Sequence, residues 1–272
     1  MPETKFASAA RHAAIAPALP PCAVLVMSCD AYRDLWNPFF TLFRRYWHDC
    51  PWPVYLGTNR LQFADEHVTS LAAGDGPWSE RLRFCLQQIE ADFVLLLLED
   101  YFFDRPVSTE QICEKFSALV ALGGAQMRLF PLPGPDRKIK AHPGLGVIGR
   151  RAEYRVSTQA AIWRRAHLLE LVREGESIWN FEWSASERSR FGTADYYAAS
   201  RPIIHYRQAV ERGEWFRGAA RYFGRQQIGC DFSARPVMSR STALKRWITT
   251  KARYLRSRLK ARLRFSSDPA DA

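Results

Sequence analysis

The chain has 272 residues, of which 47% are hydrophobic and 13% aromatic, and its formal net charge is +11. This composition can fill one large hydrophobic core, which excludes a chain that is disordered over most of its length. No apolar run approaches the roughly 20 residues of a membrane-spanning helix, and the run at 93–98 ends at a charged residue. We therefore expect no integral membrane protein.

The amino-terminal residues 1–21 predict a disordered leader. They are rich in Ala and Pro, and they lack the continuous apolar centre of a signal peptide. The six cysteines form no C-x-x-C pair, which argues against a zinc cage and against a disulfide framework. We therefore expect a reducing, cytoplasmic compartment.

Strands and helices alternate in the amino-terminal half of the chain. Apolar runs predict strands, and apolar residues at helical spacing predict helices, in the order strand 23–29, helix 34–47, strands 53–59 and 67–72, helix 79–91 and strand 93–98. The last strand is apolar on both faces, which is typical of a central parallel strand with helices on each side. The alternation predicts a doubly wound α/β domain over residues 22–230.

Polar residues follow the predicted strands at the edge where such sheets bind ligands. They are Ser28 and Asp30, Asn59, and the adjacent pair Glu99 and Asp100. No glycine-rich phosphate loop accompanies them, which disfavours Rossmann dehydrogenases and P-loop NTPases. The paired carboxylates could hold a divalent cation against phosphates or form a solvated turn. Asp30 could instead cap the following helix, although Asp34 is the better placed cap.

The second half of the chain is less regular. Residues 131–149 are rich in Pro and Gly and predict a loop that either closes over a phosphate ligand or simply connects two elements. Its cationic centre is Arg137, Lys138 and Lys140. A helix capped by Ser157 or Thr158 is predicted next, and a second helix begins near residue 177. Residues 201–215 predict a short strand and a polar turn.

Four segments of the chain resemble the nucleotide-sugar-dependent glycosyltransferases of the GT-A fold, in particular small bacterial enzymes of surface polysaccharide synthesis. They are VLVMSCDAY, PVYLGTN, WSERLRFCLQQIEADFVLLLLEDYF and STQAAIWRRAHLLELVREGESIWNFEW. The resemblance covers about residues 22–220, close to the extent of one domain. It implies a GT-A-like mixed sheet flanked by helices. It also implies an inverting hexosyl transfer from a nucleotide-diphosphate donor to a glycan or lipid-linked acceptor.

The resemblance also implies roles for individual residues. The nucleotide-binding positions are Ser28, Asp30, Asn59, Ser79 and Arg81, and the ligands of a Mn or Mg ion are Glu99, Asp100 and His205. The usual D-x-D motif is Glu-Asp-Tyr here, so the cation depends mainly on Asp100, or the enzyme is metal-independent. Arg81 could instead form a surface ion pair, and His205 could be a structural residue.

Glu182 is the predicted general base. It lies among aromatic residues in WNFEW, an environment that raises the pKa of a carboxyl group, and an inverting transfer needs a base for the acceptor hydroxyl. The resemblance also implies an acid at a helix start on the acceptor side. The alternative is a glutamate that only interacts with the helix dipole. Glu187 is the reserve candidate, and Asp195 is a weaker one.

The positive charge is concentrated near the carboxyl end. Residues 240–264 contain ten Lys and Arg and no acid, so the remaining chain is close to neutral. Apolar residues recur every three or four positions there, which predicts an amphipathic helix within a tail at 231–272. Such a helix is typical of attachment to an anionic membrane surface, here through residues 240–265. Packing on the body, docking on a partner or RNA binding are the alternatives, and no nucleic acid is expected.

Two other functions are compatible with the sequence. A sugar nucleotidyltransferase would share the α/β body and a carboxylate-bound metal, but SCDAYRDLW is not the glycine-rich basic loop that such enzymes usually carry. A noncatalytic glycan-binding or scaffold protein with a degenerate GT-A body would explain the altered metal motif.

Overall fold

The computed structural model describes residues 19–245 and 248–249. Most of the predicted leader at 1–21 and most of the predicted membrane-binding segment at 240–265 lie outside the described residues. Among the described residues, none of the helices combines the length and the apolar character needed to cross a bilayer.

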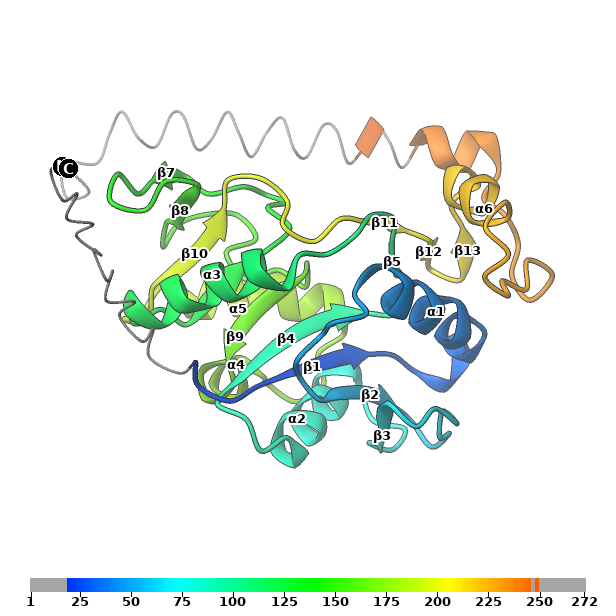
Figure 1. The fold of residues 1–272 in the computed structure, drawn as a ribbon, viewed down its shortest axis with the longest axis horizontal. Coiled ribbons are helices and arrows are strands. Elements are labelled where there is room, and N and C mark those ends of the chain that lie inside the picture. The colour runs from blue at the N-terminus through cyan, green and yellow to red at the C-terminus, as the bar shows by residue number, and fades with distance from the viewer. Residues whose placement is uncertain (1–18, 246–247, 250–272) are drawn as a thin grey trace, which may run out of the picture.

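A mixed sheet of nine strands forms the centre of the described chain (Figure 1). Its order is β3-β2-β1-β4-β9-β6-β10-β8-β7. The strands are β1 (Cys22–Met27), β2 (Val54–Thr58), β3 (Val68–Ala72), β4 (Phe93–Leu98), β6 (Gln126–Arg128), β7 (Arg137–Lys138), β8 (Leu145–Ile148), β9 (Ala161–Arg164) and β10 (Tyr196–Ala199). The first four are mutually parallel, and β9 runs antiparallel to both β4 and β6.

The order of the parallel strands changes direction between β1 and β4. From β1 the chain continues outward through β2 and β3, and it then returns to the other side of β1 with β4. The register pairs Met27 with Leu98, the last residues of these two strands. Ser28 and Glu99, which follow them, therefore emerge next to one another at the switch point, where α/β sheets bind ligands.

Helices cover both faces of this sheet, as the apolar pattern predicts. One face carries α1 (Trp36–Tyr46), α3 (Thr109–Ala121) and α6 (Arg217–Phe223), and the other carries α2 (Trp78–Gln88), α4 (Arg165–Leu171) and α5 (Ile178–Ser189). A short 3-10 helix, η1 (Asp30–Leu35), leads into α1. The expected α/β architecture is confirmed.

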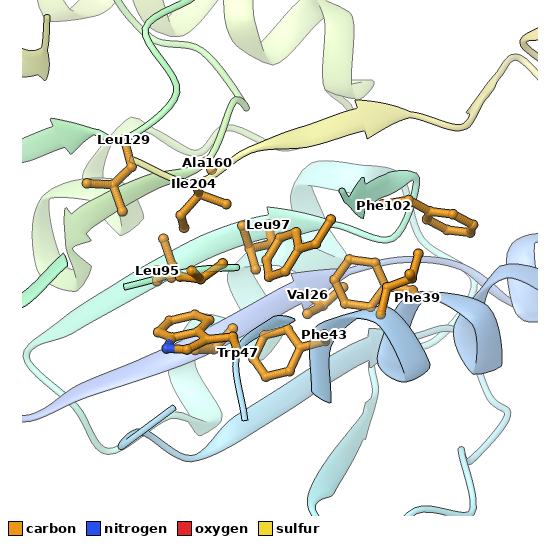
Figure 2. Close-up of a cluster of buried hydrophobic side chains, with 14 of the residues drawn as sticks. Val26, Phe39, Phe43, Trp47, Leu95, Leu97, Phe102, Leu129, Ala160 and Ile204 are labelled. Atoms are coloured by element: carbon orange, nitrogen blue, oxygen red, sulfur yellow. The ribbon is translucent and has the colours of Figure 1, made fainter. Parts of the chain in front are cut away.

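Strand β4 is buried on both sides because its side chains alternate between two hydrophobic clusters. Leu95 and Leu97 join the cluster under α1, while Leu96 and Leu98 join the cluster on the opposite face. Figure 2 shows the first cluster, where Leu95 and Leu97 lie near Phe39 and Phe43 of α1. Full burial of each such side chain contributes about 1.5–3 kcal/mol, which fixes the position of the strand end.

Two predictions for the second half are wrong. The segment after Ser157 begins with strand β9 and not with a helix, and α4 starts only at Arg165. Ala161, Ile162 and Trp163 are fully buried between two neighbouring strands, and a short apolar run of this kind cannot be told from a buried helix by periodicity. The predicted loop at 131–149 contains the β7–β8 hairpin, which extends the sheet beyond β10.

Helix α3 and strand β5 (Tyr101–Phe103) were not predicted, and the segment 201–215 contains three short strands where one was expected. Helix α3 begins after Ser108, whose hydroxyl accepts a hydrogen bond from the N–H of Gln111 (3.2 Å). A second small sheet pairs β5 with β11 (Tyr206–Gln208), and a hairpin of β12 (Val210–Glu211) and β13 (Glu214–Trp215) follows it. These late strands lie beside the end of β4, at the right of the sheet in Figure 1.

Candidate functional site

Glu99 and Asp100 form the turn that joins β4 to β5. The Glu99 side chain is buried, and the Ser28 hydroxyl and the positive charge of Arg81 stabilise its ionised form. Burial and then repulsion from Asp100 raise the pKa of Glu99 to about 8. Burial also raises the pKa of Asp100 to about 7. The pair therefore binds a proton near neutral pH unless positive charge is brought to it.

Asp100 is held from the carboxyl-terminal part of the chain. The Gln208 amide donates a hydrogen bond to Oδ2 (3.2 Å), and the N–H of Ala209 donates one to the Asp100 carbonyl (2.7 Å). Oδ1 is buried without a hydrogen-bond partner. A buried carboxylate oxygen with no donor next to a second carboxylate suits Mg²⁺ or Mn²⁺, which commonly uses one or two carboxylates together with substrate phosphates.

The prediction that His205 completes this metal site is wrong. The pairing of β11 with β5 places Tyr206 opposite Phe103 and Gln208 opposite Tyr101, so Gln208 is the residue that reaches Asp100. The His205 carbonyl instead accepts a hydrogen bond from the N–H of Asp104, at the far end of β5 (3.3 Å). The residues that the structure describes include no group of three or more His, Cys, Asp or Glu arranged to bind a metal.

Arg81 is buried at the switch point, so the alternative of a surface ion pair is wrong. Its guanidinium donates a hydrogen bond to the Ser28 carbonyl, and its charge acts on Glu99. The Ser28 hydroxyl also accepts a hydrogen bond from the indole N–H of Trp36 (2.7 Å). Helix α2 thus supplies a positive charge to the end of β1, where a nucleotide phosphate was predicted to bind.

Asp30 and Asn59 tie the ends of β1 and β2 together. The Asp30 N–H donates to Asn59 Oδ1, and the Asn59 N–H donates to Asp30 Oδ1 (3.0 Å each). The Asp30 carboxylate also accepts hydrogen bonds from the N–H groups of Arg60 and Leu61. Asp30 therefore orders the loop after β2 and caps no helix through its side chain. The two predicted nucleotide-binding residues form one unit.

Ser79 is engaged in the fold. Its hydroxyl accepts a hydrogen bond from the N–H of Glu176 (3.0 Å), and its own N–H donates to the Glu176 carbonyl (3.1 Å). Arg188 forms a bidentate ion pair with the same glutamate. Ser79 thus anchors the start of α2 to the segment that precedes α5.

Glu182 points inward from α5 to the segment before β9. Its Oε1 accepts hydrogen bonds from the N–H (2.7 Å) and the hydroxyl (2.8 Å) of Thr158 and from the Ser157 hydroxyl (3.3 Å). The helix is capped by Ser177, whose hydroxyl accepts a hydrogen bond from the N–H of Asn180. Glu182 lies in the second turn, beyond that cap. The two other candidates for the base make different contacts. The Glu187 carboxylate forms an ion pair with Arg190 (2.8 Å), and the backbone carbonyl of Asp195 accepts a hydrogen bond from the N–H of Ala125 (2.9 Å).

A tyrosine network connects Glu182 with the carboxylate pair. Gln159, next to Thr158, donates a hydrogen bond to the Tyr101 hydroxyl (3.0 Å) and accepts one from the Tyr206 hydroxyl (2.6 Å). The two tyrosine rings are stacked, with centroids 4.4 Å apart. Tyr101 directly follows Asp100, so the residue that breaks the D-x-D pattern is the one that links the two predicted sites.

The carboxyl-terminal segment contributes a second buried arginine. Arg235 forms a bidentate ion pair with Asp34 (2.8 and 2.7 Å), and its guanidinium carbon lies 4.1 Å from the centroid of the Tyr32 ring. Burial lowers the pKa of Arg235, but the hydrogen bonds and charge of Asp34 raise it above its usual value, and the charge of Glu99 adds a smaller increase. Asp34 is therefore an ion-pair partner and not the predicted helix cap. Arg235 carries no sequence signal, because it is 201 residues from Asp34.

A cavity of about 220 Å³ opens at the opposite edge of the sheet, at the amino end of β4. It contains none of the predicted site residues and is lined by Pro20, Asp92, Phe93, Val120, Arg164, Arg165 and Ala166. The predicted residues Ser28, Glu99 and Asp100 thus lie at the carboxyl edge of β1 and β4, away from this cavity.

No family model and no curated protein matches the chain. Among solved structures, it is similar to TarS 1-349 from S. aureus in complex with UDP, with a TM-score of 0.47, 13% identity, and coverage of 69% of this chain and 60% of the other. It is also similar to the mannosyltransferase PcManGT from Pyrobaculum calidifontis in complex with GDP-Man and Mn²⁺. There the TM-score is 0.48 at 12% identity, covering 72% of this chain and 59% of the other.

A third similar structure is a CMP:2-keto-3-deoxy-manno-octonic acid synthetase complexed with CTP, with a TM-score of 0.41 and 10% identity. The alignment covers 69% of this chain and 93% of the synthetase. A mannosyltransferase is thus among the solved structures that this chain resembles. The chain spans about 60% of the TarS fragment and of the mannosyltransferase.

Proposed function

We propose that this protein is a nucleotide-sugar glycosyltransferase. The observation that supports this function best is the carboxylate pair Glu99 and Asp100 at the switch point between β1 and β4. Ser28 and the buried Arg81 lie against this pair, so negative and positive groups meet at one strand edge. A nucleoside diphosphate held through a cation needs this combination of charges.

The donor diphosphate would lie over the ends of β1, β2 and β4. Asp100, with Glu99 beside it, would hold a divalent cation, which supplies positive charge to the departing diphosphate. Arg81 and Arg235 would add fixed positive charge from two sides of the same edge. The ordered loop of Asp30 and Asn59 would contact the nucleoside. Because these groups are positioned by the fold, they need little reorganisation as negative charge develops.

Glu182 would accept the proton of the acceptor hydroxyl. The hydrogen bonds from Thr158 hold one of its carboxylate oxygens in place, and the Tyr101 network connects it with the carboxylate pair. Attack on the face opposite the leaving group would make the transfer inverting. The acceptor would be a glycan or a lipid-linked glycan. Attachment to a membrane stays a prediction for residues 240–265.

The first test is release of nucleoside diphosphate from UDP-glucose, UDP-N-acetylglucosamine and GDP-mannose, measured with Mn²⁺ and with EDTA. We expect one donor to be turned over, and we expect Asp100→Asn to lower the rate by about 100-fold or more, because a charged group at the reacting centre contributes several kcal/mol. Asp104→Asn is the matched control. Asp104 is also a buried carboxylate near β5, but it pairs with Arg207 (2.8 Å).

Equal rates for the wild type and Asp100→Asn would overturn the role of Asp100. If EDTA does not change the turnover, Arg81 and Arg235 alone would stabilise the negative charge of the departing diphosphate. Release of pyrophosphate from a nucleoside triphosphate and a free sugar, with no donor cleavage, would identify a nucleotidyltransferase. If no donor or triphosphate is bound or cleaved, the proposed function is wrong and a noncatalytic glycan-binding role is favoured.

A further inference from the structure

Two exposed tryptophans stand beside Glu182 on α5. The exposed fractions are 54% for Trp179 and 66% for Trp183. Trp183 follows Trp179 by one helical turn, so the two indoles are neighbours on the helix surface. Tryptophan is usually well buried, and adjacent exposed aromatic side chains often mark a contact surface. We call these two residues the tryptophan pair.

The position of the pair around the helix relates it to Glu182. A residue advances about 100° around the axis, so Trp179 and Trp183 lie about 60° and 100° from Glu182, both in the same direction. Phe191, which is 89% exposed, lies in the turn after the carboxyl end of α5. The pair therefore borders the inward direction of Glu182, whereas Phe191 lies beyond the end of the helix.

The surface in front of the pair also continues toward the carboxylates. The guanidinium carbon of Arg212 lies 5.2 Å from the centroid of the Trp179 ring. Arg212 occupies the turn of the β12–β13 hairpin, and β12 begins two residues after Gln208, which is bonded to Asp100. A molecule that packs on the exposed part of the tryptophan pair would therefore lie beside the Arg212 turn, on the side of α5 next to Glu182.

We infer that the tryptophan pair is the subsite for a sugar ring of the acceptor glycan. The C–H face of a pyranose ring is apolar and slightly positive, so it packs on the electron-rich face of an indole. Arg212 is placed to donate hydrogen bonds to the hydroxyl or carboxylate groups at the edge of such a ring. This inference rests on the proposed function and names the class of its second substrate as a preformed oligosaccharide.

The test is direct binding of the full-length protein to immobilised tetrasaccharides of glucose, mannose, N-acetylglucosamine and glucuronic acid, without a donor. The wild type binds at least one of them, and Trp179→Ala combined with Trp183→Ala weakens binding by about tenfold or more. The double Phe variant retains most of the affinity, because it keeps aromatic faces at both positions. Phe191→Ala is the matched control and binds like the wild type.

Three results would overturn the subsite. They are absence of binding to every tetrasaccharide, an equal loss in Phe191→Ala, and a double Ala variant that keeps glycan binding but loses binding to phosphatidylglycerol vesicles. The last result would make the tryptophan pair a lipid contact. Cleavage of the donor in the absence of an acceptor does not involve the tryptophan pair. If the protein binds a glycan but cleaves no donor, only the proposed function is contradicted. Donor cleavage without glycan binding contradicts only the subsite.

Discussion

The side-chain amide of Gln208 donates a hydrogen bond to the carboxylate of Asp100, 108 positions earlier in the chain (3.2 Å). This bond joins β11 to the turn after β4 and leaves the second oxygen of Asp100 without a hydrogen-bond partner. The geometry of the proposed cation site is therefore set by a strand from the far end of the domain.

Replacement of Gln208 should shift the pH dependence of donor cleavage. The hydrogen bond lowers the pKa of Asp100, so Gln208→Leu raises that pKa and moves the acidic limb of the rate profile to higher pH. Gln208→Lys should move the limb in the opposite direction, because a positive charge favours the carboxylate. The measurement is kcat/KM for the best donor across pH, and identical profiles for all three proteins would contradict the role of Gln208.

Glu99 should make the protein less stable as the pH rises. Its pKa is raised in the folded state from 4.5 to about 8, so its contribution is fully present below about pH 4.5 and is lost as the pH rises toward about 8. Glu99→Gln removes this loss. We expect a higher unfolding free energy than wild type near pH 8, on the order of 1 kcal/mol or more, together with lower donor turnover.

Urea unfolding of both proteins near pH 5 and near pH 8 tests this prediction, with nucleotide and metal absent. The difference between the two proteins should grow with pH. A difference that stays constant across this range would show that Glu99 does not titrate there. Glu80→Gln is a suitable control, since this glutamate lies in the first turn of α2 and its carboxylate accepts a hydrogen bond from the N–H of Gly175.

Two substitutions of Glu182 should distinguish its effect on catalysis from its effect on stability. Glu182→Gln keeps an oxygen that can accept the hydrogen bonds of Thr158, so the melting temperature should change little while kcat for transfer falls by about 100-fold or more. Glu182→Ala leaves the N–H of Thr158 without its acceptor and should also cost about 1–3 kcal/mol of stability. Glu187→Gln serves as the control. Full activity of Glu182→Gln would transfer the role of base to another group.

The ion pair of Arg235 and Asp34 should hold the segment after α6 on the body. Arg235→Ala leaves Asp34 without its partner and should cost about 3 kcal/mol. Arg235→Lys should restore little, because lysine cannot form the bidentate contact. Hydrogen exchange of residues 209–238 is the measurement, and protection equal to wild type in both variants would rule out this clamp. Asp34→Asn combined with Arg235→Leu should recover part of the stability.

The sequence alone determined the order of strands and helices from β1 to β4 and the strand edge at which the candidate site lies. A strand that is apolar on both faces must be covered by helices on both sides, and this requirement made the end of β4 predictable to the residue. Strand ends in a parallel sheet share one edge, so Ser28, Glu99 and Asp100 could be grouped from their positions along the chain. Local patterns also located α5, which begins with a serine cap.

Only the tertiary structure decided what lies around those carboxylates. Three features depend on pairings between segments far apart in the sequence. They are the antiparallel position of β9 beside β4, the register that brings Gln208 rather than His205 to Asp100, and the ion pair of Arg235 with Asp34. A short apolar run does not reveal which strand it will pair with, because burial stabilises any apolar side chain of suitable volume. The role of Tyr101 could not be predicted for the same reason, because an aromatic residue in an apolar run is usually part of the core. Only the tertiary structure shows that Gln159 donates a hydrogen bond to its hydroxyl.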